Sequence, residues 1–231
     1  MRSGADGVLA YAHAMTGQQV WLGAQAQHCL LFVPGFMTGV DAYRGLLEPL
    51  VGPDLQVGIL GFVAPGLRAL LGRVSPEQEA EQVAAVAAEC AARGQAVWLG
   101  GHSRGGQVAW RAAQIVEPAG LLVVDPVDGQ GPRSGPAVTL RPPTFRVHPL
   151  VIALGAPGRC APAALGPRRF ADADPRAELV VVDGAGHADI LSGRSAARGR
   201  RLCPGSADPD AVRSRVTDLL RRRLPGDASR S

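Results

Sequence analysis

The sequence VWLGGHSRGGQVAW, at residues 97–110, decides the fold. It places Ser103 among four glycines, between an apolar run typical of a buried strand and a pattern typical of a helix. A phosphate-binding loop would need lysine and then serine or threonine where this chain has Gly106 and Gln107. The G-x-S-x-G motif at residues 101–105 instead matches a nucleophile elbow, a sharp strand-to-helix turn that exposes a serine side chain. The stretch therefore predicts that Ser103 is a nucleophile.

Apolar runs that are typical of strands alternate with helical patterns on both sides of this turn. Ser75 opens a capping box, S-P-E-Q, which predicts a helix over residues 76–92. Strands separated by helices predict the α/β class, with a mostly parallel central sheet and helices on both faces. We expect a single domain over residues 1–231, with a peripheral N-terminal segment at 1–28. The predicted strands cover residues 18–23, 29–35, 55–62, 95–101, 120–126, 149–155 and 177–184, and the other predicted helices cover 43–50, 107–116 and 210–223.

The histidine that follows the last predicted strand is the candidate general base. A serine hydroxyl needs a base within hydrogen-bond reach, and ligands of parallel sheets bind beyond the carboxyl ends of the strands. His187, in VVVDGAGHADIL, lies at that edge. His102 adjoins Ser103 on the elbow, where neighbouring side chains diverge, and the other histidines precede strands: His13, His28 and His148. We therefore predict that His187 is the base.

Two aspartates compete for the role of the acid that holds this base. The strand LLVVD ends at Asp125, and Asp128 follows in the same loop. A residue that directly ends a strand is more firmly supported, so Asp125 is the favoured acid and Asp128 is the alternative. Either choice gives the chain order serine, aspartate, histidine.

Backbone N–H groups are predicted to complete the site. A negatively charged oxygen that forms during acyl transfer needs hydrogen-bond donors aimed at it. One expected donor is the N–H of Arg104, directly after the nucleophile, and the second is the N–H of Phe36, in the turn after LLFVPG. The sequence thus predicts an oxyanion hole formed by two main-chain groups.

An apolar segment at residues 62–75 is a candidate lid loop. It contains too many apolar side chains for a loop that only contacts water. Leucines recur there at helical spacing, so a short buried helix is the alternative. As a lid, the segment would bind the hydrocarbon part of a substrate through Phe62, Leu67, Leu70 and Leu71.

Charge and hydropathy limit the classes of protein to which this chain could belong. The net charge is +4, and all 24 basic residues are arginines. Arginine clusters at residues 194–201 and 221–223 could contact an anionic membrane surface, but no aromatic residues are interleaved with them, which argues against nucleic acid. No apolar run is long enough to span a membrane, and the start lacks the apolar region of a signal peptide. We expect an intracellular protein that is soluble or peripherally associated with a membrane.

The four cysteines predict no metal site, because none of them has C-x-x-C spacing. Cys29 and Cys90 lie in a predicted strand and a predicted helix, which is typical of buried thiols. Cys160 and Cys203 fall in loops. Two unbridged thiols are the favoured interpretation there, and a disulfide is the alternative.

Taken together, the motifs resemble those of the chlorophyllase family. Its members carry the elbow as G-H-S-R-G-G, as at residues 101–106, and an acid loop similar to VDPVDG at residues 124–129. Their histidine motif is G-H followed by a short acidic and apolar stretch, like GHADIL at residues 186–191. The likeness continues more weakly from about residue 30 to the last helix. The turn VPGFMTG departs from the family, which usually has histidine before the glycine.

This resemblance implies an α/β-hydrolase fold and hydrolysis of the phytyl ester of chlorophyll to chlorophyllide and phytol. It implies a small apolar ester as partner, no metal and no organic cofactor. It also implies a chloroplast location, if the source is photosynthetic and the N-terminus is processed. Two alternatives stay open: a general esterase or lipase with another substrate, and a binding protein on a hydrolase scaffold that has lost catalysis.

Overall fold

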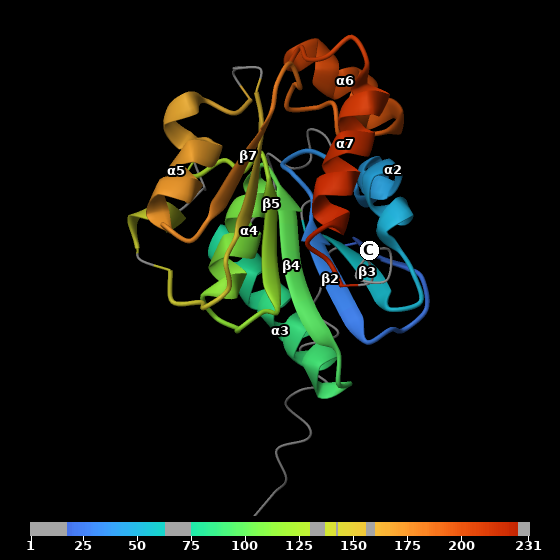
Figure 1. The fold of residues 1–231 in the computed structure, drawn as a ribbon, viewed down its shortest axis with the longest axis vertical. Helices are drawn as coiled ribbons and strands as arrows, with labels where there is room; N and C mark the ends of the chain where they lie inside the picture. Colours follow the sequence, from blue (N-terminus) through green and yellow to red (C-terminus); the bar gives the residue numbers. More distant parts are fainter. Residues whose placement is uncertain (1–17, 63–74, 130–136, 142, 156–159, 226–231) are drawn as a thin grey trace, which may run out of the picture.

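The computed structural model describes residues 18–62, 75–129, 137–141, 143–155 and 160–225. These residues form a seven-stranded sheet in the order β1-β3-β2-β4-β5-β6-β7 (Figure 1). β1 is antiparallel to β3, and all other neighbouring strands are parallel. The predicted α/β class with a mostly parallel sheet is therefore confirmed. The strands are β1 (Gln18–Leu22), β2 (His28–Val33), β3 (Leu55–Gly61), β4 (Ala96–His102), β5 (Gly120–Val124), β6 (Leu150–Leu154) and β7 (Glu178–Val182).

Side chains that alternate along the strands build an apolar layer on each face of the sheet. Leu30 and Phe32 of β2 belong to one layer, and Leu31 and Val33 belong to the other, because successive side chains point to opposite faces. Burial on both faces explains why the strands read as continuous apolar runs in the sequence. Three helices pack on the first layer, α2 (Arg44–Leu47), α6 (Gly193–Leu202) and α7 (Pro209–Arg221), and three on the second, α3 (Pro76–Ala92), α4 (Arg104–Ala113) and α5 (Pro167–Ala173) (Figure 1).

Local signals place the start of α3 but not the start of α4. The capping box at Ser75 is present, since Ser75 Oγ accepts the Gln78 N–H at 3.3 Å and Gln78 Oε1 accepts the Ser75 N–H at 3.0 Å. Helix α4 begins at Arg104, three residues before the predicted start. The glycines after Arg104 have low helix propensity, and for that reason the sequence pattern predicted too late a start.

Three other helical segments differ from the prediction. The helix predicted at residues 43–50 is a series of short pieces, η1 (Val40–Tyr43), α2 and η2 (Glu48–Leu50), in a stretch where Pro49 has no N–H for a helical hydrogen bond. Helices α5 and α6 were not predicted. Only one residue of α5, Phe170, and one of α6, Ala196, is buried, so neither helix carries an apolar repeat that the sequence would reveal.

The order of the strands defines where a ligand should bind. From β2 the chain adds β3 on one side and then crosses to β4 on the other side. Ligands of open parallel sheets bind at such a reversal, beyond the carboxyl ends of the strands. Ser103 follows β4 and the turn after Val33 follows β2, so both lie at this position.

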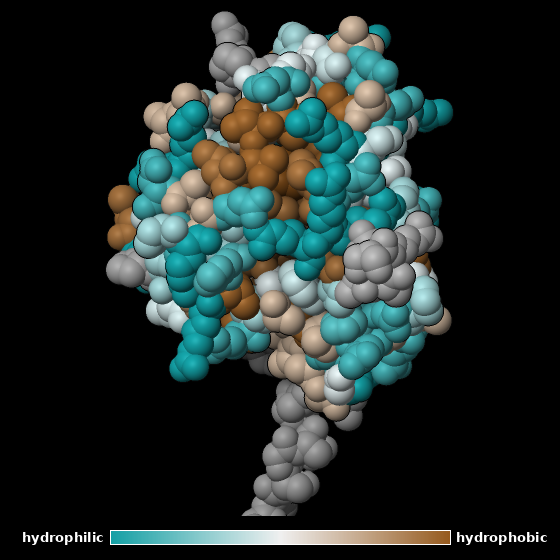
Figure 2. All heavy atoms as spheres, in the orientation of Figure 1, coloured by the Kyte–Doolittle hydropathy of each residue, from teal (hydrophilic) through white to brown (hydrophobic). Residues whose placement is uncertain are grey.

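β7 forms one edge of the sheet (Figure 1). Figure 2 shows apolar surface at the place of β7, between α5 and α6, and Val181 of this strand is 38% exposed. Apolar side chains of β7 are therefore in contact with water. No helix among the described residues has the length and apolar character needed to cross a membrane.

Candidate active site

Ser103 occupies the turn between β4 and α4. Its backbone has φ 56° and ψ −125°, a left-handed conformation that costs about 1–3 kcal/mol in a residue other than glycine. The turn is tightly packed: a Cβ built at Gly101 would overlap the carbonyl oxygen of Gly105, and one built at Gly105 would overlap that of Val33. The Ser103 carbonyl oxygen accepts the Val127 N–H at 3.1 Å. These contacts fix the backbone that presents the hydroxyl.

Asp125 follows β5 and is held by the backbone of the neighbouring strand. Its N–H donates to the Ile152 carbonyl oxygen at 2.6 Å, and its Oδ1 accepts the Leu154 N–H at 3.1 Å. The carboxylate is buried, and its Oδ2 lies 2.6 Å from His187 Nδ1. One carboxylate oxygen is therefore anchored to β6, and the other holds the imidazole.

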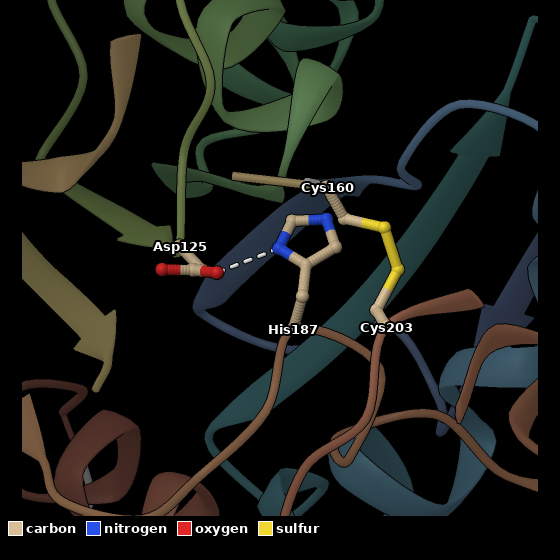
Figure 3. Close-up of a disulfide and its surroundings, with 4 residues drawn as sticks. All are labelled: Asp125, Cys160, His187 and Cys203. Carbon is tan, nitrogen blue, oxygen red and sulfur yellow. Dashed lines mark hydrogen bonds and ion pairs between the residues drawn. A yellow bond between two sulfur atoms is a disulfide. The ribbon is translucent and has the colours of Figure 1, made fainter. Parts of the chain in front are cut away.

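His187 lies in the loop after β7. In Figure 3 its Nδ1 faces Asp125, and the second ring nitrogen lies on the other side of the ring. The ring centroid of His187 is 4.5 Å from that of His102, the residue directly before Ser103. Asp125 and His187 are therefore hydrogen-bonded to each other, and His187 lies against the residue that precedes Ser103, at the carboxyl edge of the sheet.

Asp189 holds the loop that carries His187. Its buried Oδ2 accepts the N–H groups of Gly186 and Ser206, each at 2.7 Å. Gly186 packs against Gly205 so closely that a Cβ on Gly186 would overlap the main chain there. Asp189 belongs to the GHADIL motif. Its role is not predictable from the sequence, because its partner Ser206 lies beyond α6, a helix that the sequence pattern does not predict.

The turn after β2 approaches the elbow. A Cβ built at Gly35 would lie 3.2 Å from Ser103 Cβ, so a larger residue would push the turn away. The Gly35 carbonyl oxygen accepts two hydrogen bonds from Thr38, one from its Oγ1 at 2.6 Å and one from its N–H at 3.3 Å. Phe36 lies within this turn, and its side chain is exposed. The predicted donor at Phe36 is therefore part of a braced turn beside Ser103.

Arg104 directs its side chain away toward α3. Its Nη1 donates to Glu79 Oε2 at 2.5 Å, and Glu79 is buried. Burial raises the pKa of Glu79, and the hydrogen bond and charge of Arg104 lower it. Arg104 is also the first residue of α4, where N–H groups have no partner within the helix. Its main-chain N–H, rather than its guanidinium, is the group available next to Ser103.

Comparison with known proteins relates this arrangement to solved structures. No family model matches the chain, and no curated protein matches it. A thermophilic esterase from Thermogutta terrifontis, solved with malate bound, has a TM-score of 0.62 at 17% identity, over 89% of this chain and 93% of its own. A monoacylglycerol lipase from Paleococcus ferrophilus has a TM-score of 0.60 at 14% identity, over 88% and 99%. A serine hydrolase without a lid, from Xanthomonas campestris, has a TM-score of 0.56 at 20% identity, over 91% and 96%.

The strand order, the turn at Ser103 and the similar structures all indicate the same fold. This chain has the α/β-hydrolase fold. The fold predicted from the sequence is therefore confirmed, whereas the narrower likeness to the chlorophyllase family gains no support from the comparisons. At these identities the similar structures show the fold alone.

Backbone strain in this α/β-hydrolase fold is concentrated at the site. Among the described residues, the non-glycine residues with positive φ are Met37, Ser103 and Asp125, with φ of 64°, 56° and 43°. Met37 follows Phe36 in the turn after β2, and the other two follow β4 and β5. Strained residues persist only where the surrounding structure holds them in place, and they are commonly found at active sites. Three strained positions at one edge of the sheet therefore support this edge as the candidate site.

His102 lies at the candidate site, although the sequence pattern predicts no role for it. It is buried at the end of β4, and its Nδ1 lies 2.7 Å from the hydroxyl of Tyr43. Burial lowers the pKa of His102 well below its ordinary value, and the nearby His187 lowers it further. Tyr43 is also buried, and burial raises its pKa. Both side chains are therefore neutral near pH 7. No sequence signal links them, because they come from different elements.

We expect stability to decline below about pH 6.5 because of His102. In this range the unfolded chain takes up a proton that the folded chain excludes, since the folded-state pKa of His102 is depressed. The contribution is complete above the unfolded pKa and is lost as the pH falls toward the folded one, by up to about 1.4 kcal/mol per pH unit. Urea unfolding at several pH values measures the slope. In His102→Asn the slope should be smaller, and an unchanged slope would contradict this prediction.

A disulfide joins Cys160 and Cys203 near His187 (Figure 3). Cys203 directly follows α6, and Cys160 lies after β6; their sequence separation is 43, and their Cα atoms are 6.1 Å apart. The favoured sequence interpretation, two unbridged thiols, is therefore wrong. The loops meet only because the chain from α6 returns beside the loop of His187. The predicted buried thiols at Cys29 and Cys90 are confirmed.

Removing this disulfide should destabilise the protein. Cys160→Ser together with Cys203→Ser removes the cross-link that closes a long loop, so the unfolded chain gains conformational entropy. The free energy of unfolding should fall by about 2–4 kcal/mol. Urea titration with and without a reductant provides the check. The reductant should destabilise the wild type to the level of the double variant and leave the double variant unchanged. Equal stability of all four samples would show that the bridge adds nothing.

Asp128, the alternative acid, has a different place in the structure. Its buried carboxylate accepts hydrogen bonds from Gln107 Nε2 at 3.1 Å and from the Val138 N–H at 2.8 Å. It also accepts the N–H and the hydroxyl of Thr139, at 3.1 and 2.5 Å. Asp128 therefore fastens residues 138–139 to α4, and the carboxylate that reaches His187 belongs to Asp125.

The candidate lid lies mostly outside the described residues. Leu67, Leu70 and Leu71 fall in the gap at residues 63–74. Phe62, at the start of the segment, is buried in the apolar layer that contains α3 and α4. A role of these four side chains in substrate binding stays a prediction.

Within the described ranges no group of three or more histidine, cysteine, aspartate or glutamate residues is placed to hold a metal ion. A cavity of about 510 Å³ lies near the start of β3, lined by residues 49–55 and by Arg221, Leu224 and Pro225. Since Ser103 follows the carboxyl end of β4, this cavity is remote from the strained edge.

Proposed function

We propose that this protein is a serine hydrolase of carboxylic esters. The proposal rests chiefly on the 2.6 Å hydrogen bond between His187 Nδ1 and Asp125 Oδ2, together with the strained backbone of Ser103. A serine hydroxyl attacks carbonyl carbon only when a neighbouring base removes its proton and a third group orients that base. The three residues have the chain order of a hydrolase of this fold, and the hydrogen bond from Asp125 supports the proposed orientation of His187.

In the proposed reaction, the Ser103 hydroxyl attacks the ester carbonyl while His187 Nε2 takes its proton. Asp125 holds the imidazole in the required tautomer and stabilises its cation. The N–H groups of Phe36 and Arg104 donate to the oxyanion of the tetrahedral intermediate. His187 then protonates the departing alcohol and activates the water that hydrolyses the acyl-enzyme. No metal or organic cofactor takes part in these steps.

Small-molecule esters are the proposed substrates in general. The similar structures include an esterase and a monoacylglycerol lipase, which favours a general ester hydrolase over a narrower activity. The narrower proposal, the phytyl ester of chlorophyll, rests on the motifs GHSRGG, VDPVDG and GHADIL. Peripheral membrane contact through the arginine clusters and a chloroplast location stay predictions.

A fluorophosphonate probe and a short chromogenic ester test the general proposal. The probe should label the wild type at Ser103 and leave Ser103→Ala unlabelled, and the wild type should hydrolyse p-nitrophenyl acetate. Labelling at another residue would overturn the assignment of the nucleophile. Absence of both labelling and hydrolysis in a folded sample would instead favour a binding protein that has lost catalysis.

Chlorophyll a tests the narrower proposal. Incubation with the wild type, followed by chromatography, should show chlorophyllide that is absent with Ser103→Ala. A protein that hydrolyses p-nitrophenyl esters but leaves chlorophyll intact would be a general esterase, and the narrower proposal would be wrong.

A further inference from the structure

A buried polar network lies directly behind the proposed oxyanion hole. The hydroxyl of Tyr43 accepts the Gly35 N–H at 2.8 Å and lies 2.7 Å from His102 Nδ1. It also lies 3.1 Å from Thr38 Oγ1, which donates to the Gly35 carbonyl oxygen at 2.6 Å. A tyrosine hydroxyl can donate or accept, so the contact with His102 is satisfied in either tautomer of the histidine. The network joins the end of β4 to the turn after β2.

The network determines the direction of the Phe36 N–H. The Gly35 carbonyl and the Phe36 N–H belong to one trans peptide unit, in which the two groups point in opposite directions. The Gly35 carbonyl accepts a hydrogen bond from Thr38 Oγ1, which holds the plane of that peptide, and the Gly35 N–H donates to Tyr43, which holds the preceding peptide unit. With the carbonyl held by Thr38, the Phe36 N–H points in the opposite direction within that plane.

His102 also contacts the proposed base. Its ring centroid lies 4.5 Å from that of His187, with an angle of 39° between the ring planes. The ring of His102 is buried, and a Cβ at Gly35 would lie 3.1 Å from its Nδ1. His102 thus contacts the turn after β2 through Tyr43. It also contacts the ring of His187 directly, and it precedes Ser103 in the chain.

We propose that His102 is a positioning residue. Together with Tyr43 it holds the Phe36 N–H and the His187 ring in their positions relative to Ser103. This inference rests on the proposed function. It assigns no proton transfer to His102. The residue acts through its neighbours, so its loss should reduce turnover more than substrate binding.

Three variants test this role with p-nitrophenyl acetate. His102→Phe keeps an aromatic ring and removes the bond to Tyr43, and Tyr43→Phe removes only the hydroxyl. Each should lower kcat by about 10²-fold with little change in KM, because a displacement of about 1 Å has an effect of that size. The double variant should be little worse than either single one, because both break the same contact. His102→Asn places a polar atom where Nδ1 lies and should restore most of kcat.

Thr217→Val is the matched control. Thr217 lies on α7, and its hydroxyl donates one buried hydrogen bond to the Leu46 carbonyl oxygen at 3.0 Å. Its loss should lower Tm and leave kcat unchanged. If His102→Phe and Tyr43→Phe lower only Tm, as this control does, His102 has a structural role alone and the inference is wrong. If Ser103→Ala is as active as the wild type, the proposed function fails instead.

Discussion

Ser103→Ala is expected to lower ester turnover by about 10⁵–10⁶-fold, to the level left by substrate binding and the oxyanion hole. The reason is chemical, because alanine has no hydroxyl to attack the carbonyl. The positive φ at Ser103 is equally unfavourable for alanine, so the substitution should change stability little. The initial rate with p-nitrophenyl acetate, measured against an enzyme-free blank, provides the test.

The control for Ser103→Ala is the folded state of the variant. Circular dichroism and Tm should match those of the wild type, because the glycine packing and the main-chain bonds of the elbow do not involve the hydroxyl. His187→Ala should lose nearly as much activity, since the members of such a triad act as a unit. The double variant should be little worse than either single variant. Full turnover in Ser103→Ala would refute the assignment of the nucleophile.

Asp125→Asn is expected to lower turnover by about 10⁴-fold with the fold preserved. The Leu154 N–H donates to Oδ1, so the amide oxygen of the new asparagine should take that place and its NH₂ should face His187. An NH₂ group can only donate, so His187 Nδ1 would have to accept and the proton would move to Nε2. In that tautomer Nε2 cannot take the proton of Ser103. Steady-state kinetics with the same ester measures the loss in kcat.

Asp128→Asn is the matched control for Asp125→Asn. Asp128 accepts hydrogen bonds from Gln107, Val138 and Thr139, whereas the hydrogen bond to His187 comes from Asp125. Replacing one of its oxygens by NH₂ should break some of these bonds and lower Tm, with turnover reduced far less than in Asp125→Asn. The reverse ranking of turnover would transfer the acid role to Asp128.

Much of the fold was predictable because its signals are local. A strand that is buried on both faces needs a continuous apolar run, and the helix α3 needs a cap, which S-P-E-Q supplies. The elbow needs small residues on both sides of Ser103, and these are visible as glycines. Helices α5 and α6 escaped prediction because almost none of their residues is buried. A helix that contributes little to the core leaves little trace in the pattern.

The candidate site was likewise predictable only where its signals are local. The sequence by itself determined the strand-to-helix turn at Ser103, the alternating order of strands and helices, and a histidine in the loop after the last strand. Only the tertiary structure decided that Asp125 rather than Asp128 reaches His187, that Cys160 meets Cys203, and that His102 joins Tyr43 to the ring of His187. The physical reason is the range of the interactions. Turn geometry and burial are set by neighbouring residues, whereas hydrogen bonds between loops of different strands exist only after the sheet has brought those loops to one edge.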